Sequence, residues 1–461
     1  MNILQAFDHP DLFGGAIRNP ETFYAWRVFL SALFGLTVAE EDLKLFTECT
    51  GRTTAPTKAF QEAWLICGRR SGKSFVMALV AVFLACFRDY SQYLAPGERA
   101  TLMVIAADRR QSRVIMRYIA GLLTIPILAK LLESERAESF DLTNRVTIEV
   151  ATASIKSVRG YTIAACLCDE ISFWGDDESA NADRDVIASI LPAMVTIPGA
   201  VLLCASSPYA ARGALYDADR KHWGKNDAPV LIWRAPTRTM NPTVPQKVID
   251  DAIEADAASA ASEYLAQYRT DVSSFFGRDE VLAAVAEGVY ERAPLWEFDY
   301  SGFADPSGGS SDSFTLAVGH CEDDRVIIDA VREWKPPFSP DKVVREACEL
   351  LKSYRISEIR GDRYAAAFNE EKFRENGIAY RPSEKPKSDL YLNTLPMMNS
   401  GRVELLDNQR LITQLIALER RTGRDSVDHA PGNKDDLANS VAGVIAHATT
   451  RRPRRREVYF A

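Results

Sequence analysis

The chain has few of the residues that build metal centres with nitrogen and sulfur ligands. It contains 5 histidines and 8 cysteines among 461 residues. No cysteine or histidine pair has the spacing of a zinc site, and Cys166 and Cys168 are two residues apart on a predicted strand. The pattern argues against a structural zinc centre and is typical of reduced, buried thiols.

A long hydrophobic run is also missing. The longest apolar stretch, residues 75–87, is shorter than the roughly 20 residues that a membrane-spanning helix needs. The first residues, Met1 to Gln5, show no basic segment followed by an apolar stretch, as a secretory leader would. We therefore expect no signal peptide, no transmembrane segment and an intracellular protein.

The chain has no excess of positive charge. Its formal net charge is -8 at pH 7, so any contact with nucleic acid must come from local basic surfaces rather than from the overall field. The length and the 47% content of hydrophobic residues are sufficient for at least two packed domains.

What the sequence does contain is a phosphate-binding loop near residue 70. An apolar strand pattern over residues 64–67 precedes a Gly-rich turn, and a helical run over residues 75–84 follows it. Such a loop directs backbone N–H groups and a helix N-terminus at an anion, while its lysine contacts terminal phosphates and its serine binds Mg²⁺. Three residues rather than the usual four separate the two glycines, and Cys67 stands at the usual first glycine. The loop residues are Gly68, Arg69, Arg70, Ser71, Gly72, Lys73 and Ser74.

A second motif supplies the other half of a nucleotide site. The apolar strand over residues 162–168 ends in Asp169 and Glu170, which is a Walker B pattern. We expect Asp169 to hold Mg²⁺ through water and Glu170 to be the base that polarises the attacking water. Another apolar strand, over residues 200–204, leads to Ser206 and Ser207, whose hydroxyls would lie beside the γ-phosphate. An ordinary Ser-Ser-Pro turn explains these serines equally well.

Strand and helix patterns alternate around these motifs. A strand is predicted over residues 100–107, then a basic stretch that starts a helix reaching about Leu132, and another strand over residues 146–150. This alternation predicts an α/β domain with a parallel sheet. We assign residues 1–235 to a P-loop ATPase domain. Residues 236–290, helical at first and then rich in chain breakers, are assigned to a lid and linker.

The rest of the chain, residues 291–461, has a strand-rich pattern and forms a second predicted domain. Its tail over residues 451–456 is rich in arginine. The expected strands cover residues 300–305, 313–320, 325–333 and 356–361, and the expected helices residues 340–354, 408–421 and 435–449.

Aspartates lie at the ends of these elements. Asp305 ends the first strand, Asp362 follows the fourth, and Asp435 and Asp436 begin the last helix, with Asp312 in a loop as an auxiliary candidate. Two Mg²⁺ or Mn²⁺ ions roughly 3.5–4 Å apart need several oxygen ligands, and phosphodiester hydrolysis is their natural chemistry. Asp305, Asp362 and Asp436 are therefore the candidate catalytic residues. Each aspartate alone is as readily a cap, a turn or a surface residue.

The order of the motifs resembles the large subunit of tailed-phage terminases over about residues 45–448. The resemblance implies an additional-strand (ASCE) P-loop ATPase domain, a lid and an RNase H/resolvase-like nuclease domain. ATP and Mg²⁺ are the implied cofactors, with Mn²⁺ as an alternative at the nuclease site. The motifs that carry it are residues 68–74, Cys168-Asp169-Glu170, Ala205-Ser206-Ser207-Pro208, Asp305-Pro306-Ser307-Gly308-Gly309, Gly361-Asp362-Arg363-Tyr364 and Lys434-Asp435-Asp436-Leu437.

The resemblance also implies roles for single residues. Arg159 would be a finger that reaches the neighbouring subunit's nucleotide, and a partner within its own subunit is the alternative. Ser206 and Ser207 would couple hydrolysis to movement. Lys387 would contact the DNA backbone, and a solvated lysine is the alternative. The arginine-rich tail would contact DNA or a portal ring, or solubilise the chain as a disordered segment.

The implied partners are double-stranded DNA, a portal protein, a small terminase subunit and further copies in a homo-oligomeric ring, in the host cell cytoplasm and without a membrane. The expected function is ATP-driven packaging of viral DNA into procapsids with endonucleolytic cutting of concatemers. A DNA helicase or repair translocase with an attached nuclease is the runner-up, although the sequence shows no helicase motifs. A non-catalytic DNA-binding scaffold is disfavoured because Lys73, Asp169 and Glu170 occur together.

Overall fold

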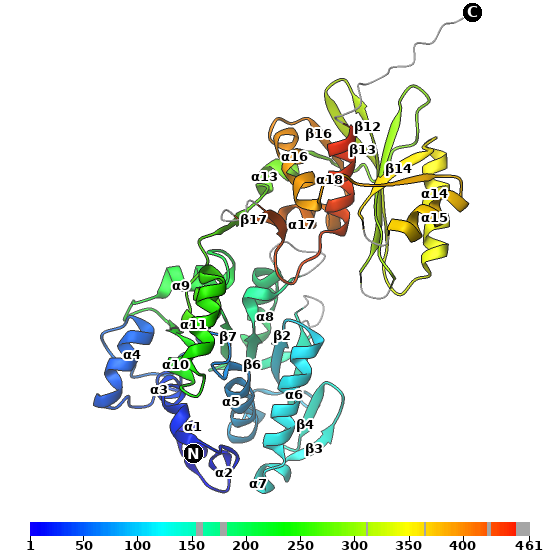
Figure 1. The fold of residues 1–461 in the computed structure, drawn as a ribbon. Helices are drawn as coiled ribbons and strands as arrows, with labels where there is room; N and C mark the ends of the chain where they lie inside the picture. The colour runs from blue at the N-terminus through cyan, green and yellow to red at the C-terminus, as the bar shows by residue number, and fades with distance from the viewer. Residues whose placement is uncertain (154–159, 176–181, 310–311, 364–365, 422–425, 449–461) are drawn as a thin grey trace, which may run out of the picture. The chain divides into compact units, whose positions relative to one another are not determined.

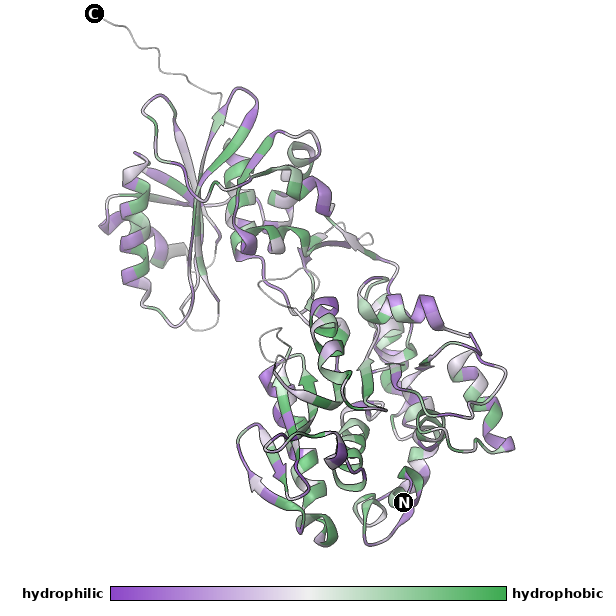
Figure 2. Cartoon of the chain, turned by 180° about the vertical axis from the view of Figure 1, so that it is seen from behind, coloured by the Kyte–Doolittle hydropathy of each residue, from purple (hydrophilic) through white to green (hydrophobic). Residues whose placement is uncertain are grey.

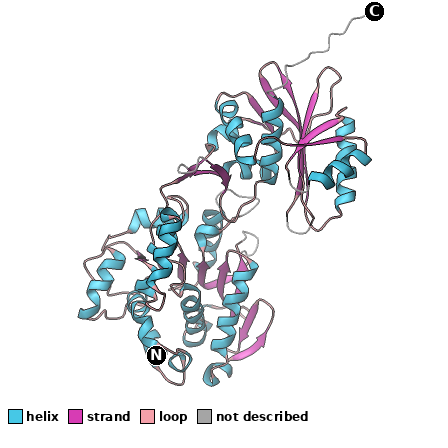
Figure 3. Cartoon of the chain, viewed as in Figure 1, coloured by secondary structure: helices cyan, strands magenta, loops and turns pink. Residues whose placement is uncertain are grey.

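The computed structural model describes residues 1–153, 160–175, 182–309, 312–363, 366–421 and 426–448. The chain forms two compact units, the first ending at Thr270 and the second beginning at Asp271. This division falls inside the range 236–290, for which a separate lid stays a prediction. Figure 3 shows that both units combine helices with strands. Among the helices in these ranges, none combines the length and hydrophobicity needed to cross a membrane.

The first unit is built on one sheet. Its strands are β1 Glu62–Cys67, β2 Ala100–Ala106, β3 Leu132–Glu135, β4 Ser139–Leu142, β5 Val146–Thr152, β6 Thr162–Asp169, β7 Val201–Ser206 and β8 Val230–Ala235. They form an eight-stranded sheet in the order β3-β4-β5-β2-β6-β7-β1-β8. Every neighbouring pair from β5 to β8 is parallel, and β3 and β4 add an antiparallel edge. Because β7 is inserted between the phosphate-loop strand β1 and the Walker B strand β6, the unit is an additional-strand P-loop ATPase fold.

The helices of this unit pack around the sheet, with α5 and α6 against one another and against β2, β5 and β6. Figure 1 shows α5 and α6 beside the labelled strands β2 and β6. The helices are α1 Ile3–Asp8, α2 Phe13–Ala16, α3 Tyr24–Leu33, α4 Leu43–Thr50, α5 Lys73–Phe87, α6 Arg109–Leu123, α7 Pro126–Ala129, α8 Ala182–Met194, α9 Ala214–His222, α10 Thr237–Met240, α11 Gln246–Ala255 and α12 Ala257–Leu265.

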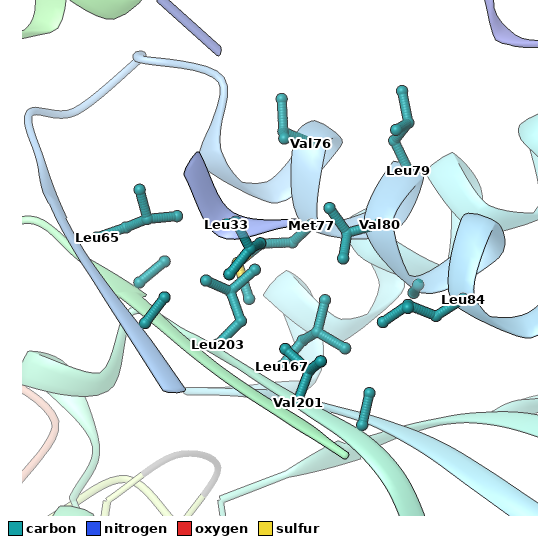
Figure 4. Packing of buried hydrophobic residues seen from close by; sticks show 14 of the residues in the cluster. Leu33, Leu65, Val76, Met77, Leu79, Val80, Leu84, Leu167, Val201 and Leu203 are labelled. Carbon is teal, nitrogen blue, oxygen red and sulfur yellow. The ribbon is translucent and has the colours of Figure 1, made fainter. Parts of the chain in front are cut away.

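Helix α5 is buried on nearly all sides, as its almost continuous apolar sequence indicates. In Figure 4 the side chains of Met77 and Val80 lie among those of Leu65, Leu167 and Leu203 from three strands of the sheet. Each such side chain contributes about 1.5–3 kcal/mol of transfer free energy when fully buried. This packing fixes the start of α5, and therefore the phosphate loop, relative to the strand ends.

The second unit contains a larger mixed sheet and a small antiparallel one. The strands are β9 Val272–Ser274, β10 Val285–Ala286, β11 Tyr300–Asp305, β12 Phe314–Glu322, β13 Arg325–Trp334, β14 Glu358–Gly361, β15 Ala379–Pro382, β16 Val403–Leu406, β17 Leu418–Arg421 and β18 Ser426–His429. The seven-stranded sheet has the order β10-β16-β13-β12-β11-β14-β15, and β18-β17-β9 form the other. Strands β13, β12 and β11 are antiparallel, whereas β11, β14 and β15 are parallel. This core order is that of an RNase H-like fold.

Helices cover both faces of the larger sheet. Figure 1 shows α14 and α15 on one face and α16, α17 and α18 on the other, and a separate hydrophobic cluster lies on each side. Figure 2 shows the apolar colouring concentrated along the strands and the inner sides of the helices. The helices are α13 Arg278–Ala283, α14 Pro340–Ser353, α15 Ala366–Glu375, α16 Lys387–Asn399, α17 Gln409–Ile416 and α18 Asp436–Ala448.

Two predicted helices are wrong in their second halves. Helix α6 ends at Leu123 rather than near residue 132, because Pro126 disfavours helical backbone at Ile125, which is extended (φ -56°, ψ 126°). The helix predicted over residues 408–421 ends at Ile416, and β17 follows it. Pairing of β17 with β9 and β18 outweighs the helical periodicity there.

Candidate active sites

The phosphate loop connects the carboxyl end of β1 to the N-terminus of α5. Gly72 caps α5 in the left-handed region (φ 100°), which only glycine adopts without strain. Trp26 Nε1 donates a hydrogen bond of 3.0 Å to the carbonyl oxygen of Ser71 and fixes the crest of the loop. The arrangement presents a helix N-terminus to an anion, as a phosphate site requires.

Residues downstream of β8 brace this loop. Thr237 Oγ1 donates to the carbonyl oxygen of Arg69 at 2.8 Å, and Asn241 Nδ2 donates to that of Arg70 at 2.9 Å. The Arg69 side chain forms an ion pair of 2.9 Å with Glu263. A Cβ at Gly68 would lie 2.3 Å from Thr237 Oγ1, so the approach requires glycine. The start of the predicted lid range therefore contacts the loop directly.

Ser74 and Asp169 form the candidate magnesium site. Ser74 Oγ donates to Asp169 Oδ2 at 2.7 Å. The other carboxylate oxygen, Asp169 Oδ1, is buried and has no hydrogen-bond partner within the described ranges. Burial and the neighbouring Glu170 raise the pKa of Asp169. A buried carboxylate with an unused oxygen beside a hydroxyl fits a hard divalent cation, which removes the cost of that buried charge.

Glu170 lies at the centre of a network that contains the other predicted residues. Its Oε1 is 3.3 Å from Lys73 Nζ, and its Oε2 accepts hydrogen bonds of 3.1 Å from Ser206 Oγ and from the Ser207 backbone N–H. Lys73 Nζ also donates to Ser207 Oγ at 3.2 Å and to the Cys67 carbonyl at 3.0 Å. The two serines thus contact the Walker B carboxylate rather than forming an isolated turn.

A cavity opens on the phosphate loop. Its volume of ≈ 610 Å³ lies within the range of about 300–1,000 Å³ that is typical of small-molecule sites. Loop residues 70–75 and Glu170 line one side. Val114 and Tyr118 of α6 and residues 241–245 line the other. No sequence pattern indicated these opposite walls, because helical periodicity identifies a buried face but not what that face adjoins.

Arg159, the predicted finger, lies outside the described residues, so its role stays a prediction.

In the second unit, Asp305 and Asp362 lie at neighbouring strand ends. Strands β11 and β14 are parallel, with Ala304 opposite Gly361. The Asp362 backbone N–H donates to the carbonyl oxygen of Ala304 at 3.0 Å. The two aspartates, far apart in sequence, therefore emerge at the same edge of the sheet.

The first turn of α18 adds Asp436 to this edge. Thr315 Oγ1 of β12 donates to the backbone carbonyl of Asp436 at 2.7 Å. One turn later, Asn439 Nδ2 donates to Asp305 Oδ2 at 2.7 Å. Gln414 Oε1 of α17 accepts from the backbone N–H groups of residues 437 and 438, at 2.8 and 3.1 Å, and so caps the helix start. Asn439 and Gln414 escaped the sequence reasoning because neither belongs to an acidic motif.

The electrostatics of these carboxyl groups favour a bound cation. Burial, opposed by the hydrogen bond from Asn439 and reinforced by Asp362, Asp436 and Asp435, raises the pKa of Asp305 to about 8. Burial also raises the pKa of Asp436 to about 6, against the effect of Lys434. Asp436 Oδ2 is buried without a partner among the described residues. Clustered carboxylates with an unused buried oxygen are a donor set that fits Mg²⁺ or Mn²⁺.

The two remaining predicted ligands have other partners. Asp435 Oδ2 lies 2.9 Å from Lys387 Nζ and accepts a hydrogen bond of 2.8 Å from Tyr391 Oη. Asp312 is exposed and pairs with Lys434 Nζ at 2.9 Å. Lys387, the predicted DNA contact, is therefore in an ion pair. The structure groups Asp305, Asp362 and Asp436 and engages Asp435 and Asp312 with lysines.

Comparison with protein-family models gives no match, and comparison with curated proteins gives none either. Among solved structures, the chain is similar to the HK97 bacteriophage large terminase (13% identity, 92% of this chain and 100% of that chain, TM-score 0.38). It is also similar to a large terminase from a thermophilic bacteriophage in complex with ADP (12%, 89% and 98%, TM-score 0.37). The third is the large terminase nuclease of thermophilic phage G20c with bound magnesium (18%, 38% and 96%, TM-score 0.32).

Proposed function

We propose that this chain is a large terminase subunit. Its first unit hydrolyses ATP to move double-stranded viral DNA into a procapsid, and its second unit cuts DNA concatemers with divalent metal ions. The observation that carries the proposal is that one chain builds both sites from separate motifs: Lys73, Ser74, Asp169 and Glu170 in one unit, and Asp305, Asp362 and Asp436 in the other.

ATP hydrolysis at the first site requires positioning and charge stabilisation rather than covalent chemistry. The backbone of the loop and Lys73 would hold the phosphates, and Ser74 and Asp169 would hold Mg²⁺, which neutralises phosphate charge when bound. Glu170 would orient the attacking water and take its proton. Its contacts with Ser206 and the Ser207 N–H keep the carboxylate in place.

DNA cleavage at the second site uses the grouped aspartates. Asp305, Asp362 and Asp436 would hold Mg²⁺ or Mn²⁺, which activates water and stabilises the leaving oxygen when bound. Asn439 orients Asp305 by donating to one of its oxygens, which leaves the other for a cation. Thr315 fixes the start of α18 and with it the position of Asp436.

A local basic surface on α6 suits the backbone of DNA. Arg109, Arg110, Arg113 and Arg117 are exposed along this helix, which carries no acidic residue. None of their side chains has a hydrogen-bond or ion-pair partner within the described ranges. Residues four apart recur on one helix face, so Arg109, Arg113 and Arg117 form a stripe. Such a stripe offers phosphate contacts that the net charge of -8 does not provide.

The remaining parts of the proposal concern assembly. A homo-oligomeric ring on the procapsid, a portal protein and a small terminase subunit are the proposed partners, in the host cell cytoplasm. In such a ring Arg159 would stabilise charge on the transferring phosphoryl group of a neighbour, an effect of about 10³ to 10⁵ for arginine fingers.

The test measures ATP hydrolysis and plasmid cleavage by the full chain, with and without linear double-stranded DNA. We expect DNA to stimulate ATPase, and Mg²⁺ or Mn²⁺ to be required for cleavage. A double Arg113→Gln/Arg117→Gln variant should weaken DNA binding and reduce the slope of log affinity against log salt by about 2, since each phosphate contact contributes about 0.9.

The matched control is Arg18→Gln/Arg220→Gln, which removes two exposed arginines elsewhere in the first unit and should keep the wild-type slope. Absence of both ATPase and cleavage would favour a non-catalytic scaffold. ATP-dependent separation of a forked duplex would favour the helicase alternative.

A further inference from the structure

Asp435 is held by side chains from a different helix. Lys387 Nζ, at the start of α16, lies 2.9 Å from Asp435 Oδ2 and 3.2 Å from Asp428 Oδ1. One turn further along α16, Tyr391 Oη donates to the same Asp435 oxygen at 2.8 Å. Tyr391 is fully buried and Asp435 is 5% exposed. This carboxylate therefore already has a full-charge partner and a neutral donor in a dry environment.

Its neighbour in the sequence is in the opposite situation. Asp436 Oδ2 is buried but has no hydrogen-bond partner among the described residues. Its backbone is fixed by Thr315 Oγ1, so the carboxylate is positioned without being neutralised. A buried carboxylate oxygen without a partner is costly unless a cation takes that place. Adjacent aspartates thus differ in what their oxygens are available for.

We propose that Lys387 is a positioning residue of the nuclease centre. With Tyr391, it retains Asp435 as the counter-ion of α16 and so reserves metal ligation for Asp436 together with Asp305 and Asp362. The inference rests on the proposed nuclease function. It assigns Lys387 a role before DNA arrives, whereas a contact with the DNA backbone would act only after DNA binds.

The two roles differ because of charge. Lys387 stands between two carboxylates, Asp428 and Asp435, so its ammonium is already compensated and has little capacity left for a phosphate. Removing that ammonium leaves Asp435 without its counter-ion beside three other carboxylates. A fourth carboxylate then competes for the ions, which bind more tightly but in the wrong arrangement.

The experiment titrates Mn²⁺ into the full chain without DNA, by calorimetry and by the electron paramagnetic resonance signal of free Mn²⁺, and then measures DNA cleavage. We expect Lys387→Met to tighten Mn²⁺ binding about five-fold, because a positive charge is lost and a ligand gained. The same variant should lower kcat for cleavage about ten-fold or more, with KM for DNA unchanged. Lys387→Arg should stay close to wild type in both measurements.

Lys385→Met is the matched control, because this lysine lies two residues away and has no ion-pair partner within the described ranges. It should change neither Mn²⁺ affinity nor kcat. If Lys387→Met unfolds the protein, Tyr391→Phe replaces it: the ion pair stays, one contact to Asp435 is lost, and both effects should appear with the same signs but smaller.

Unchanged or weaker Mn²⁺ binding by Lys387→Met in a folded chain would overturn the inference, and so would a rise in KM alone. Loss of a bound ion in Asp435→Asn but not in Asp436→Asn would also overturn it. The failure of the nuclease proposal looks different: Asp305→Asn and Asp362→Asn would then both bind Mn²⁺ as the wild type does.

Discussion

At the scale of single residues, Glu170 is the position where the first site concentrates its constraints. Its backbone is left-handed (φ 52°, ψ 44°), a conformation that residues other than glycine seldom adopt. Trp174 Nε1 donates to the carbonyl oxygen of the preceding Asp169 at 2.9 Å, which helps to hold the turn. Strained backbone of this kind persists where the surrounding contacts over-determine it, and it is common at functional sites.

The first prediction concerns this carboxylate. Glu170→Gln should keep nucleotide binding but reduce the ATPase turnover number by about 10² to 10⁴, because a general base is lost while the phosphate ligands remain. Turnover and the affinity for a fluorescent nucleotide are the two measurements. Glu133→Gln, an exposed glutamate of β3 in the same unit, is the control and should have wild-type values. Hydrolysis by Glu170→Gln at the wild-type rate would disprove the assignment of the base.

At the scale of elements, α10 supports the phosphate loop. Thr237 is completely buried, and its hydroxyl donates to the loop carbonyl of Arg69. The sequence places Thr237 and Arg69 168 residues apart, so no local pattern connects them. The first part of the predicted lid range is therefore part of the wall that shapes the nucleotide site.

The second prediction follows from this contact. Thr237→Val keeps the shape but removes a hydrogen bond worth about 1 kcal/mol, so the Kd for ATP should rise about five-fold. Thr237→Ser, which retains the hydroxyl, should bind nearly as the wild type does. Thr239→Val, at an exposed position of the same helix, is the control. Equal nucleotide affinity in Thr237→Val and Thr239→Val would show that α10 does not position the loop.

Helix α17 has a similar role for the second site. Gln414 is 3% exposed and accepts two backbone N–H groups from the first turn of α18. Helix N-termini leave such donors without partners inside the helix itself. A side chain from another helix thus caps α18 and holds the turn that carries Asp436.

The third prediction removes this cap. Gln414→Leu should lower the free energy of unfolding of the second unit by about 1–3 kcal/mol, since buried N–H groups lose their acceptor. DNA cleavage should fall with it, because Asp436 and Asn439 are no longer fixed. Denaturant unfolding and a plasmid-cleavage assay are the measurements, with Gln409→Leu at the exposed start of α17 as the control.

Gln414→Glu distinguishes capping from packing. Its carboxylate still accepts from the two N–H groups and interacts favourably with a helix N-terminus. Recovery of cleavage in Gln414→Glu, but not in Gln414→Leu, is the expected result. A Gln414→Leu variant with wild-type stability and cleavage would contradict the capping role.

At the scale of the whole molecule, two chemistries are divided between two units with separate hydrophobic cores. Each unit is large enough to bury a core of its own, and each site is built from residues of one unit only. The acidic balance of the chain, with a net charge of -8, means that DNA must be bound by local surfaces rather than by the overall field.

The fourth prediction is a separation of activities. Lys73→Ala should abolish ATP binding and hydrolysis but leave metal-dependent DNA cleavage, because the cleavage site shares no residue with the loop. Asp305→Asn and Asp362→Asn should do the reverse. ATPase and cleavage rates of each variant are compared under one buffer condition, with Asp312→Asn expected to change cleavage less than Asp305→Asn. Loss of both activities in every variant would argue against two independent sites.

Much of the local structure was readable in the sequence. Strand β11 has the predicted bounds, and α18 starts within one residue of the predicted position. The loop at residues 68–74 and the carboxylates Asp169 and Glu170 lie where their motifs predicted. These features depend on short-range chemistry: alternation of period two, helical periodicity, and glycine or aspartate at the end of an apolar run.

By itself, then, the sequence determined the type and order of the elements and the identity of the charged groups at their ends. Only the tertiary structure decided which side chains use those charges. Asp435 and Asp436 are equivalent as sequence, but Lys387 and Tyr391 neutralise the first while the second keeps a buried oxygen without a described partner. The physical reason is that partners such as Asn439 for Asp305, which are 134 residues apart, are set by how helices pack on strands and not by any local spacing.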